Sequence, residues 1–250
     1  MGKVIAVVNQ KGGVGKTTTA VNVASYIASS KKVLVVDMDP QGNSTLGFGL
    51  DKSAEGDNVY HLLVDSVPVR SVIKHTAIKN LDIIPSNKDL VGAEIELVKM
   101  DDRESRLKNA LAEVKKDYDY IFIDSPPSLG YLTLNALVAA DSAMIPMQCE
   151  FFALDGLAQL LGTIELVKES LNPKLAIEGV VITMYDSRTT LSVQVVQELK
   201  KMFKDKVYDT IIPRNVRLSE APSFGQPINL YDKNARGAKA YEKLAEEILG

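Results

Sequence analysis

Seven short apolar runs, rich in valine and isoleucine, recur along this 250-residue chain and alternate with amphipathic stretches. Apolar residues follow helical spacing over 103–116, 153–171 and 189–203. Runs that are apolar at nearly every position indicate strands buried on both faces, as in a parallel sheet covered by helices. The sequence therefore predicts an α/β fold with a doubly wound, mostly parallel sheet and helices on both faces. The predicted strands are 4–9, 32–39, 81–85, 120–125, 142–147, 177–184 and 206–213.

Charge, cysteine content and the chain's ends exclude several classes of protein. The net charge of −3 does not indicate a globally basic nucleic-acid binder. One cysteine, Cys149, allows no intramolecular disulfide and leaves too few thiols for a zinc or iron–sulfur site within one chain. No signal peptide, linker or membrane-spanning run is evident. We expect residues 1–250 to form a single domain of a cytoplasmic protein.

Three polar loops follow predicted strands at their carboxyl ends: NQKGGVGKT, DMDPQGN and DSPPSLG. In doubly wound sheets, ligands bind beyond the carboxyl ends of the strands, where the strand order reverses. The three loops are therefore expected to converge on one edge of the sheet and to form a nucleotide site there.

The first loop has the features of a phosphate-binding loop. Gly12, Gly13 and Gly15 let the backbone approach a phosphate, and their N–H groups can form an anion nest at a helix N-terminus near Lys16. Lys16 is expected to contact the β- and γ-phosphates, and Thr17 to offer its hydroxyl to Mg²⁺. The loop departs from the common G-x-x-x-x-G-K-[ST] pattern, because Gln10 replaces its first glycine and Lys11 follows.

Acidic residues in the other two loops suit metal binding and water activation. Asp39 can orient a water for in-line attack and hold the hydration shell of Mg²⁺, and Asp124 can hold Mg²⁺ directly or through water. Helix capping or a turn remains the alternative role for Asp39 and for Asp37.

These motifs together resemble the ParA/MinD group of deviant-Walker ATPases, a group of P-loop NTPases. KGGVGKTT, VDMDPQGN and IFIDSPPSLG carry the resemblance, and MIPMQCEFFALDGL, MYDSRTTLSVQVVQEL and IPRNVRLSEAPSFGQPI narrow it to chromosomal ParA proteins of the Soj type. The resemblance covers essentially the whole chain. It implies an ATPase with ATP and Mg²⁺ as cofactors, acting as an ATP-sandwich homodimer in which Lys11 reaches the partner's phosphates, as an arginine finger does.

The resemblance also implies roles for individual residues. Asp39 matches the acid that activates the attacking water, and Asp124 the acid that holds Mg²⁺. Lys11 and Lys16 match catalytic lysines. Residues 212–215 follow a predicted strand where the family contacts the adenine base, and an ordinary turn at the end of a strand is their alternative role. The expected nucleotide-binding residues are Lys11, Gly12, Gly13, Val14, Gly15, Lys16, Thr17, Thr18, Pro213, Arg214 and Asn215.

A basic segment from Arg188 to Arg217 carries seven basic and three acidic residues, a net charge of +4 on an acidic protein. Such a segment can bind nucleic-acid phosphates without sequence preference, although a solvated helix face is the general alternative. Arg188 and Arg217 match arginines with which the family holds DNA, and Lys200, Lys201 and Lys204 are further candidates.

The resemblance implies non-specific double-stranded DNA and a ParB-type protein as partners, and a nucleoid-associated location. A MinD-like membrane switch is the alternative, but residues 243–250 hold one lysine and two glutamates, which favours packing on the domain over insertion at an anionic membrane. The chain has no room for an N-terminal helix-turn-helix, so we expect no operator recognition and no membrane binding.

Overall fold

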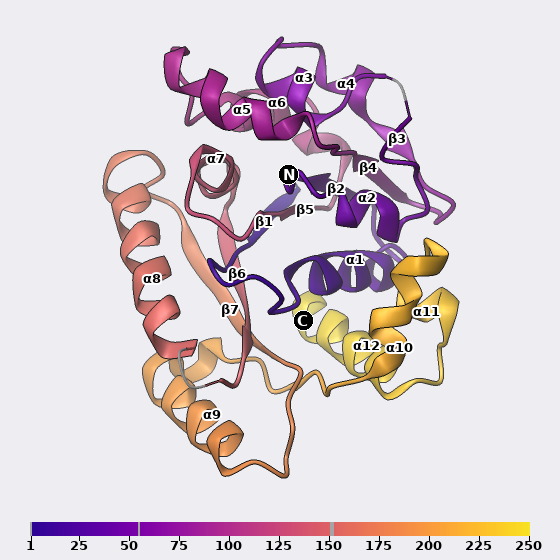
Figure 1. The fold of residues 1–250 in the computed structure, drawn as a ribbon, viewed down its shortest axis with the longest axis vertical. Helices are drawn as coiled ribbons and strands as arrows, with labels where there is room; N and C mark the ends of the chain where they lie inside the picture. The colour runs from indigo at the N-terminus through magenta and orange to yellow at the C-terminus, as the bar shows by residue number, and fades with distance from the viewer. Residues whose placement is uncertain (1, 55, 151–152) are drawn as a thin grey trace.

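Seven strands form one sheet in the computed structural model, which describes residues 2–54, 56–150 and 153–250. Their order is β3-β4-β2-β5-β1-β6-β7, and every pairing is parallel except that of β3 with β4 (Figure 1). The predicted doubly wound α/β class is confirmed. The strands are β1 Lys3–Val7, β2 Val33–Asp37, β3 Lys74–His75, β4 Leu81–Ile84, β5 Tyr120–Asp124, β6 Ser142–Gln148 and β7 Ala176–Thr183.

Helices cover both faces of this sheet, in two layers (Figure 1). One layer is α3 Val59–Leu63, α4 Val69–Val72, α5 Leu90–Glu96, α6 Arg106–Ala112, α7 Tyr131–Ala139, α8 Ala153–Ser170 and α9 Thr190–Phe203, with 3₁₀ turns η1 Leu97–Lys99, η2 Lys115–Asp117 and η3 Lys204–Lys206. The other is α1 Lys16–Ile27, α2 Asn43–Gly47, α10 Val216–Glu220, η4 Ala221–Phe224, α11 Ile228–Tyr231 and α12 Arg236–Leu249. In the part of the chain that the structure describes, no helix is long and apolar enough to cross a membrane.

The two-residue repeat of a strand divides the core into two clusters. In β1, Val4 and Ala6 face the layer that contains α7, whereas Ile5 and Val7 face α1 and α12. Because both faces of the central strands are covered, nearly every position is apolar, which is why the runs were visible in the sequence.

The predicted strand 206–213 is wrong, because this segment contributes only isolated bridges beside β7, Val180 to Val207 and Tyr185 to Pro213. Between them the backbone N–H of Thr210 donates to Glu247 Oε1 on α12, at 2.9 Å, instead of joining the sheet. The strand that was not predicted is β3, whose two exposed residues are too few and too polar to give an apolar run in the sequence.

Two glycines allow a close approach between α2 and the segment after η4. Gly49 and Gly225 have φ angles of 78° and 62°, in the left-handed region. A Cβ on Gly225 would lie 2.7 Å from the Cα of Gly49, so neither a strain-free backbone nor space is available for a side chain.

Gly225→Ala is expected to lower the free energy of unfolding by roughly 2 kcal/mol or more, from left-handed strain and overpacking. Urea denaturation would measure it. The matched control is Gly162→Ala on α8, where a Cβ meets nothing within 4 Å. Since alanine favours helix, this control should raise the stability by up to about 1 kcal/mol. Equal stability of the two variants would contradict the assigned contact.

Candidate functional site

The loop between β1 and α1 has the backbone that an anion nest requires. Gly13 and Gly15 have φ angles of 73° and 91°, and Gly15 is the N-cap of α1. The first turn of the helix closes with a hydrogen bond of 2.9 Å from Thr19 N–H to Gly15 O. The free N–H groups of a helix N-terminus and a left-handed loop are suited to hold a phosphate.

Residues from two neighbouring strands hold this loop in place. The side chain of Asn9 donates to Pro146 O on β6 at 2.8 Å and accepts from Lys11 N–H at 2.9 Å. The Thr183 hydroxyl, at the end of β7, donates to Val14 O at 2.7 Å. The roles of Asn9 and Thr183 were not predicted from the sequence, where their only signal was a polar residue at the end of an apolar run.

The two lysines of the loop lie in different surroundings. Lys16 is buried and its Nζ donates to Lys11 O at 3.0 Å. Burial lowers the pKa of Lys16, and the charges of Asp124 and Asp39 act in the opposite direction. The side chain of Lys11 is 40% exposed and forms an ion pair with Glu150, after β6. The next residues of that motif, Phe151 and Phe152, lie outside the described residues.

Two buried aspartates lie side by side at the carboxyl ends of β2 and β5. Asp37 and Asp124 are paired in the sheet register, and both are fully buried. The first residues of α2 hold both, because Ser44 Oγ donates to Asp124 Oδ2 and Thr45 donates through its N–H and hydroxyl to Asp37 Oδ2, each at 2.8 Å. Asp37 also accepts from Asp39 N–H at 3.2 Å.

This arrangement disfavours two negative charges. Burial, and then the charge of Asp124, raises the pKa of Asp37 to about 8. Burial also raises the pKa of Asp124 to about 6, although hydrogen bonds from Ser44 and Thr17 and the charge of Lys16 oppose the shift. The pair therefore holds a proton near neutral pH, which a nearby cation would displace.

The residues at Asp124 fit a magnesium ion. Its Oδ1 is buried and has no hydrogen-bond partner within the described ranges, and the Thr17 hydroxyl lies beside this carboxylate. Carboxylate and hydroxyl oxygens, completed by water and phosphate oxygens, are what Mg²⁺ prefers. Asp39 is buried at the same edge, and its Oδ1 accepts from Gln41 N–H at 2.9 Å.

A cavity of about 510 Å³ opens beside the loop, within the size range of small-molecule sites. Several predicted residues line it together. Lys11, Val14 and Asp124 do not: Val14 is buried beneath the loop, and Asp124 lies behind Thr17 and Lys16. The predicted residues that line the cavity are Gly12, Gly13, Gly15, Lys16, Thr17, Thr18, Asp39, Pro213, Arg214 and Asn215.

Further residues that the sequence analysis missed close this cavity from the side of α10 and α12. Leu218 and Pro222 offer apolar surface, and buried Tyr241 of α12 shares a hydrogen bond of 3.1 Å with Thr19 of α1. Asn215 Oδ1 is buried without a partner among the described residues, so a ligand in the cavity can supply a donor. Amphipathic spacing in 236–249 was the one available signal for Tyr241.

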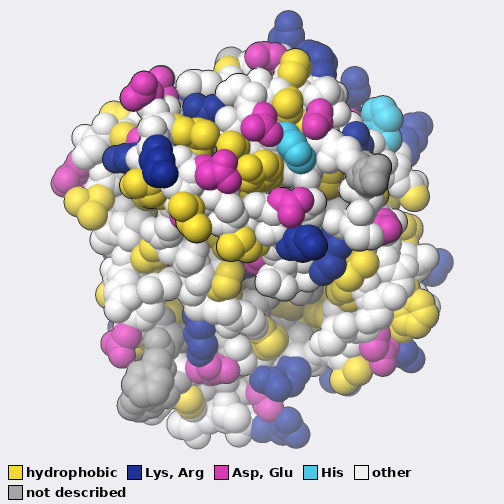
Figure 2. Space-filling view, turned by 45° about the horizontal axis from the view of Figure 1, so that its top comes forward, with side chains coloured by type: hydrophobic (Ala, Val, Ile, Leu, Met, Phe, Trp, Pro, Cys, Tyr) yellow, Lys and Arg dark blue, Asp and Glu magenta, His cyan; other side chains and the backbone are white. Residues whose placement is uncertain are grey.

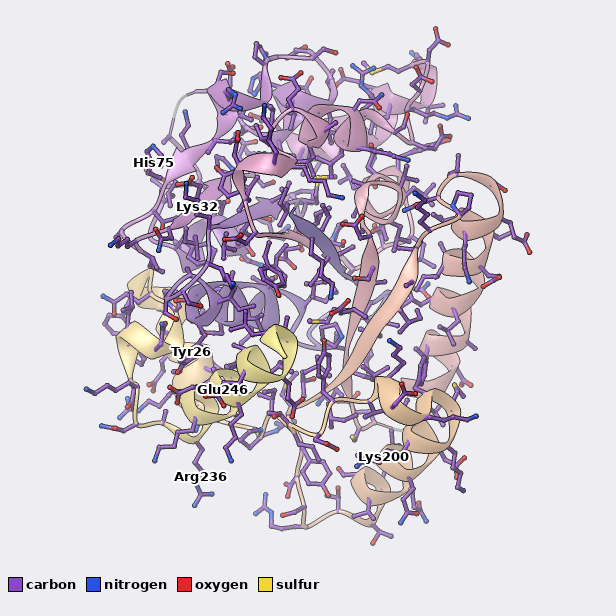
Figure 3. The ribbon with its side chains drawn as sticks, turned by 180° about the vertical axis from the view of Figure 1, so that it is seen from behind. Tyr26, Lys32, His75, Lys200, Arg236 and Glu246 are labelled. Carbon is purple, nitrogen blue, oxygen red and sulfur yellow. The ribbon has the colours of Figure 1, made fainter. Side chains whose placement is uncertain are left out.

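The predicted DNA-binding residues lie outside the cavity, on the surface. Arg188 follows β7 and pairs with Asp186 at 2.6 Å; Arg217 on α10 pairs with Glu220 at 2.8 Å. Lys200 and Lys201 lie on α9, near Asp209 at 3.9 Å and Glu198 at 2.6 Å, and Lys204 begins η3. Figure 3 places Lys200 at the end of the molecule away from His75.

Comparison with known proteins gives the family. A family model described as an AAA domain matches residues 2–177. The sporulation initiation inhibitor protein Soj of Bacillus subtilis (strain 168) is 59% identical over 249 residues, which cover 99% of this chain and 98% of the relative. The chain belongs to the ParA/Soj family of chromosome-partitioning ATPases.

Solved structures share the fold of this chain. A cobyrinic acid a,c-diamide synthase from Mycobacterium smegmatis, with bound ATP analogue and magnesium, has a TM-score of 0.88 at 37% identity; the match covers 100% of this chain and 94% of that one. The septum site-determining protein MinD of Pyrococcus horikoshii, complexed with Mg-ADP, has a TM-score of 0.81 at 26% identity; the match covers 99% of this chain and 96% of that one.

The unfolding free energy of the nucleotide-free protein should fall as the pH rises from 6 to 8, and Asp37→Asn should flatten this fall. The pKa of Asp37 is about 8 in the folded protein against 3.8 as its ordinary value, so the folded state binds more protons in this window. Stability then decreases with pH until the folded pKa is passed.

Urea denaturation at pH 6, 7 and 8 measures this slope. The substitution can also place an amide N–H group against Asp39 N–H, which would change the stability at every pH. The slope of stability against pH is therefore compared, and not the absolute stability. Asp205→Asn, at an acid outside the site, is the control and should keep the parent slope. Parallel slopes for the parent and Asp37→Asn would contradict a shared proton at this pair.

Proposed function

We propose that this protein is a partitioning ATPase that hydrolyses ATP with Mg²⁺, dimerises around ATP, and binds double-stranded DNA without sequence preference in that state. A ParB-type partner stimulates hydrolysis and so releases the DNA. The protein acts as a single domain in the cytoplasm, on the nucleoid. The Bacillus relative is 59% identical, against 37% for the Mycobacterium structure, which favours partitioning over the activity printed for the latter.

The observation that carries the proposal is that two lysines of one loop have different positions and contacts. Lys16 lines the cavity of its own chain, whereas Lys11 does not and points to Glu150. An exposed ion pair contributes little stability, so Lys11 can leave Glu150 for a stronger partner. In an ATP-sandwich dimer that partner is the phosphate chain held by the other protomer, which links charge stabilisation to dimerisation.

Hydrolysis follows from the positions of the acids. Asp39 lines the cavity and orients a water, whose oxygen bonds to the γ-phosphorus as the bond to the bridging oxygen breaks. ADP leaves with that oxygen, and the water's protons pass to the carboxylate and to the released phosphate. Lys16 and Lys11 stabilise the charge on the phosphate oxygens. Bound Mg²⁺, held through Thr17 and Asp124, neutralises further negative charge when it is present.

The nucleotide cavity is connected to the proposed DNA face through short segments. Thr183 and Met184 line the cavity, and Arg188 follows within four residues. Pro213, Arg214 and Asn215 line it too, and Arg217 follows within two. Backbone hydrogen bonds join the two segments, from Tyr185 N–H to Ile212 O and from Arg214 N–H to Tyr185 O. A nucleotide that orders these segments therefore places both arginines.

The packing of α12 argues against a MinD-like membrane switch. Its apolar residues, including Tyr241, Leu244 and Ile248, are buried against the α1 side of the sheet. In Figure 3, Tyr26 of α1 and Glu246 of α12 lie on the same side of the molecule. A helix whose apolar face is already buried has none to insert into a bilayer.

Asp39→Ala should bind ATP and form a stable dimer, but hydrolyse ATP about 100-fold more slowly or worse, because it lacks the group that orients the water. Phosphate release measures hydrolysis, and light scattering after size exclusion measures the dimer. Lys11→Ala is the matched control: it should bind ATP as a monomer. An ATP-dependent dimer of Lys11→Ala would refute the role in trans, and an active Asp39→Ala the assigned acid.

Arg188→Ala with Arg217→Ala should bind DNA much more weakly than the parent while keeping the ATP-dependent dimer. Four phosphate contacts per dimer disappear, so the slope of log affinity against log salt should shrink by about 3 to 4. DNA retention with ATP, ADP and no nucleotide over a salt series measures this. Arg70→Ala, which removes another exposed, ion-paired arginine, is the control. An unchanged slope in the double variant would move the DNA face elsewhere.

A further inference from the structure

Helix α5 and the following turn η1 carry apolar residues on two opposite faces. Leu90, Ala93 and Leu97 are fully buried in the core. Val91, Ile95 and Val98 are 58%, 69% and 49% exposed. Their spacing of four and three residues stacks these three side chains on successive turns, so they form one outer stripe.

Such a stripe is unusual for a surface helix, which normally has polar residues opposite its buried face. Single exposed apolar residues are common on proteins, but a contiguous set marks a binding surface more often. The inner residues already anchor α5, so the outer three contribute nothing to the core. The outer stripe, Val91, Ile95 and Val98, is therefore available to another molecule.

Acidic residues outnumber basic ones in the segment that carries the outer stripe. From the N-cap of α5, Asp89, to that of α6, Ser105, the chain has six acidic and two basic residues, a net charge of −4, with Lys88 just outside. Figure 2, which brings the top of Figure 1 forward, shows hydrophobic side chains on this face with acidic and some basic side chains between them. The surface is apolar with an acidic rim.

The apolar and acidic character of this surface favours one kind of binding partner over others. A second copy meeting this surface about a two-fold axis would place the same acidic rim against itself, which is unfavourable. An anionic membrane would be repelled in the same way. A segment with apolar side chains flanked by lysines or arginines is complementary in both respects.

The outer stripe is also connected to the phosphate site. Glu94, next to Ile95, accepts from the N–H groups of Tyr131 at 2.9 Å and Leu132 at 3.3 Å, and so caps α7. A Cβ on Gly130 would lie 2.4 Å from the Glu94 carboxylate, so a side chain there would displace this carboxylate. The loop that ends at Gly130 begins at Asp124, beside Thr17.

We propose that the outer stripe is the docking surface for a basic, apolar segment of the ParB-type partner, and that docking acts on hydrolysis through Glu94 and the 124–130 loop. This inference rests on the proposed function, since it locates the partner named there. The segment covers Val91, Ile95 and Val98, and its cations meet the acidic rim. Holding α5 in this way holds the N-terminus of α7 and the loop that ends there.

The test measures ATP hydrolysis, with DNA present, against the concentration of the purified full-length ParB-type protein from the same cell. Ile95→Lys places a repelling charge in the outer stripe and should raise the concentration for half-maximal stimulation tenfold or more. Ile95→Glu, which loses the apolar contact but keeps the acidic sign, should raise it less. Hydrolysis without the partner should equal that of the parent for both variants.

Leu166→Lys on α8 is the matched control, since Leu166 is 65% exposed on another helix. It should respond to the partner as the parent does. Parent-like stimulation of Ile95→Lys would overturn the docking surface and leave the proposed function standing. Failure of the partner to stimulate the parent would overturn the partner assignment and the docking with it. Loss of the ATP-dependent dimer in Ile95→Lys alone would assign the stripe to a second copy instead.

Discussion

The site depends on the fixed backbone of the loop between β1 and α1. Its anion-binding power comes from peptide N–H groups, which are effective only when they are aimed in advance. Gly13 and Gly15 permit the required conformation but do not enforce it, because glycine is the most flexible residue. Enforcement comes from hydrogen bonds to Asn9 and Thr183, which tie the loop to β6 and β7.

The same edge of the sheet brings the acids into place. Asp37 and Asp124 end adjacent strands, so their proximity follows from the parallel register and not from any local motif. Their mutual repulsion is tolerated because Ser44 and Thr45 donate to them and because they hold a proton. An arrangement that is unfavourable with two charges is well suited to receive a cation.

Most of the fold and the phosphate-binding loop could be predicted from the sequence. The central strands were visible because burial on both faces makes them apolar throughout, and the loop was visible because phosphate binding fixes residue types at fixed spacing. Segment 206–213 was misjudged because its apolar pattern is that of a strand, whereas a competing bond from Thr210 to Glu247 is not visible in a pattern. Asn9, Thr183 and Tyr241 were missed because their partners are distant in sequence.

The hydrogen bond between Thr19 and Tyr241 has a consequence for how the protein is made. Its two residues are 222 positions apart, and the bond holds Tyr241 at the wall of the cavity. During synthesis, the loop and α1 leave the ribosome long before α12 does, and until then the cavity lacks that wall. Nucleotide can stabilise the fold only by binding the folded state. Nucleotide in this cavity therefore stabilises the completed fold more than a chain that still lacks α12.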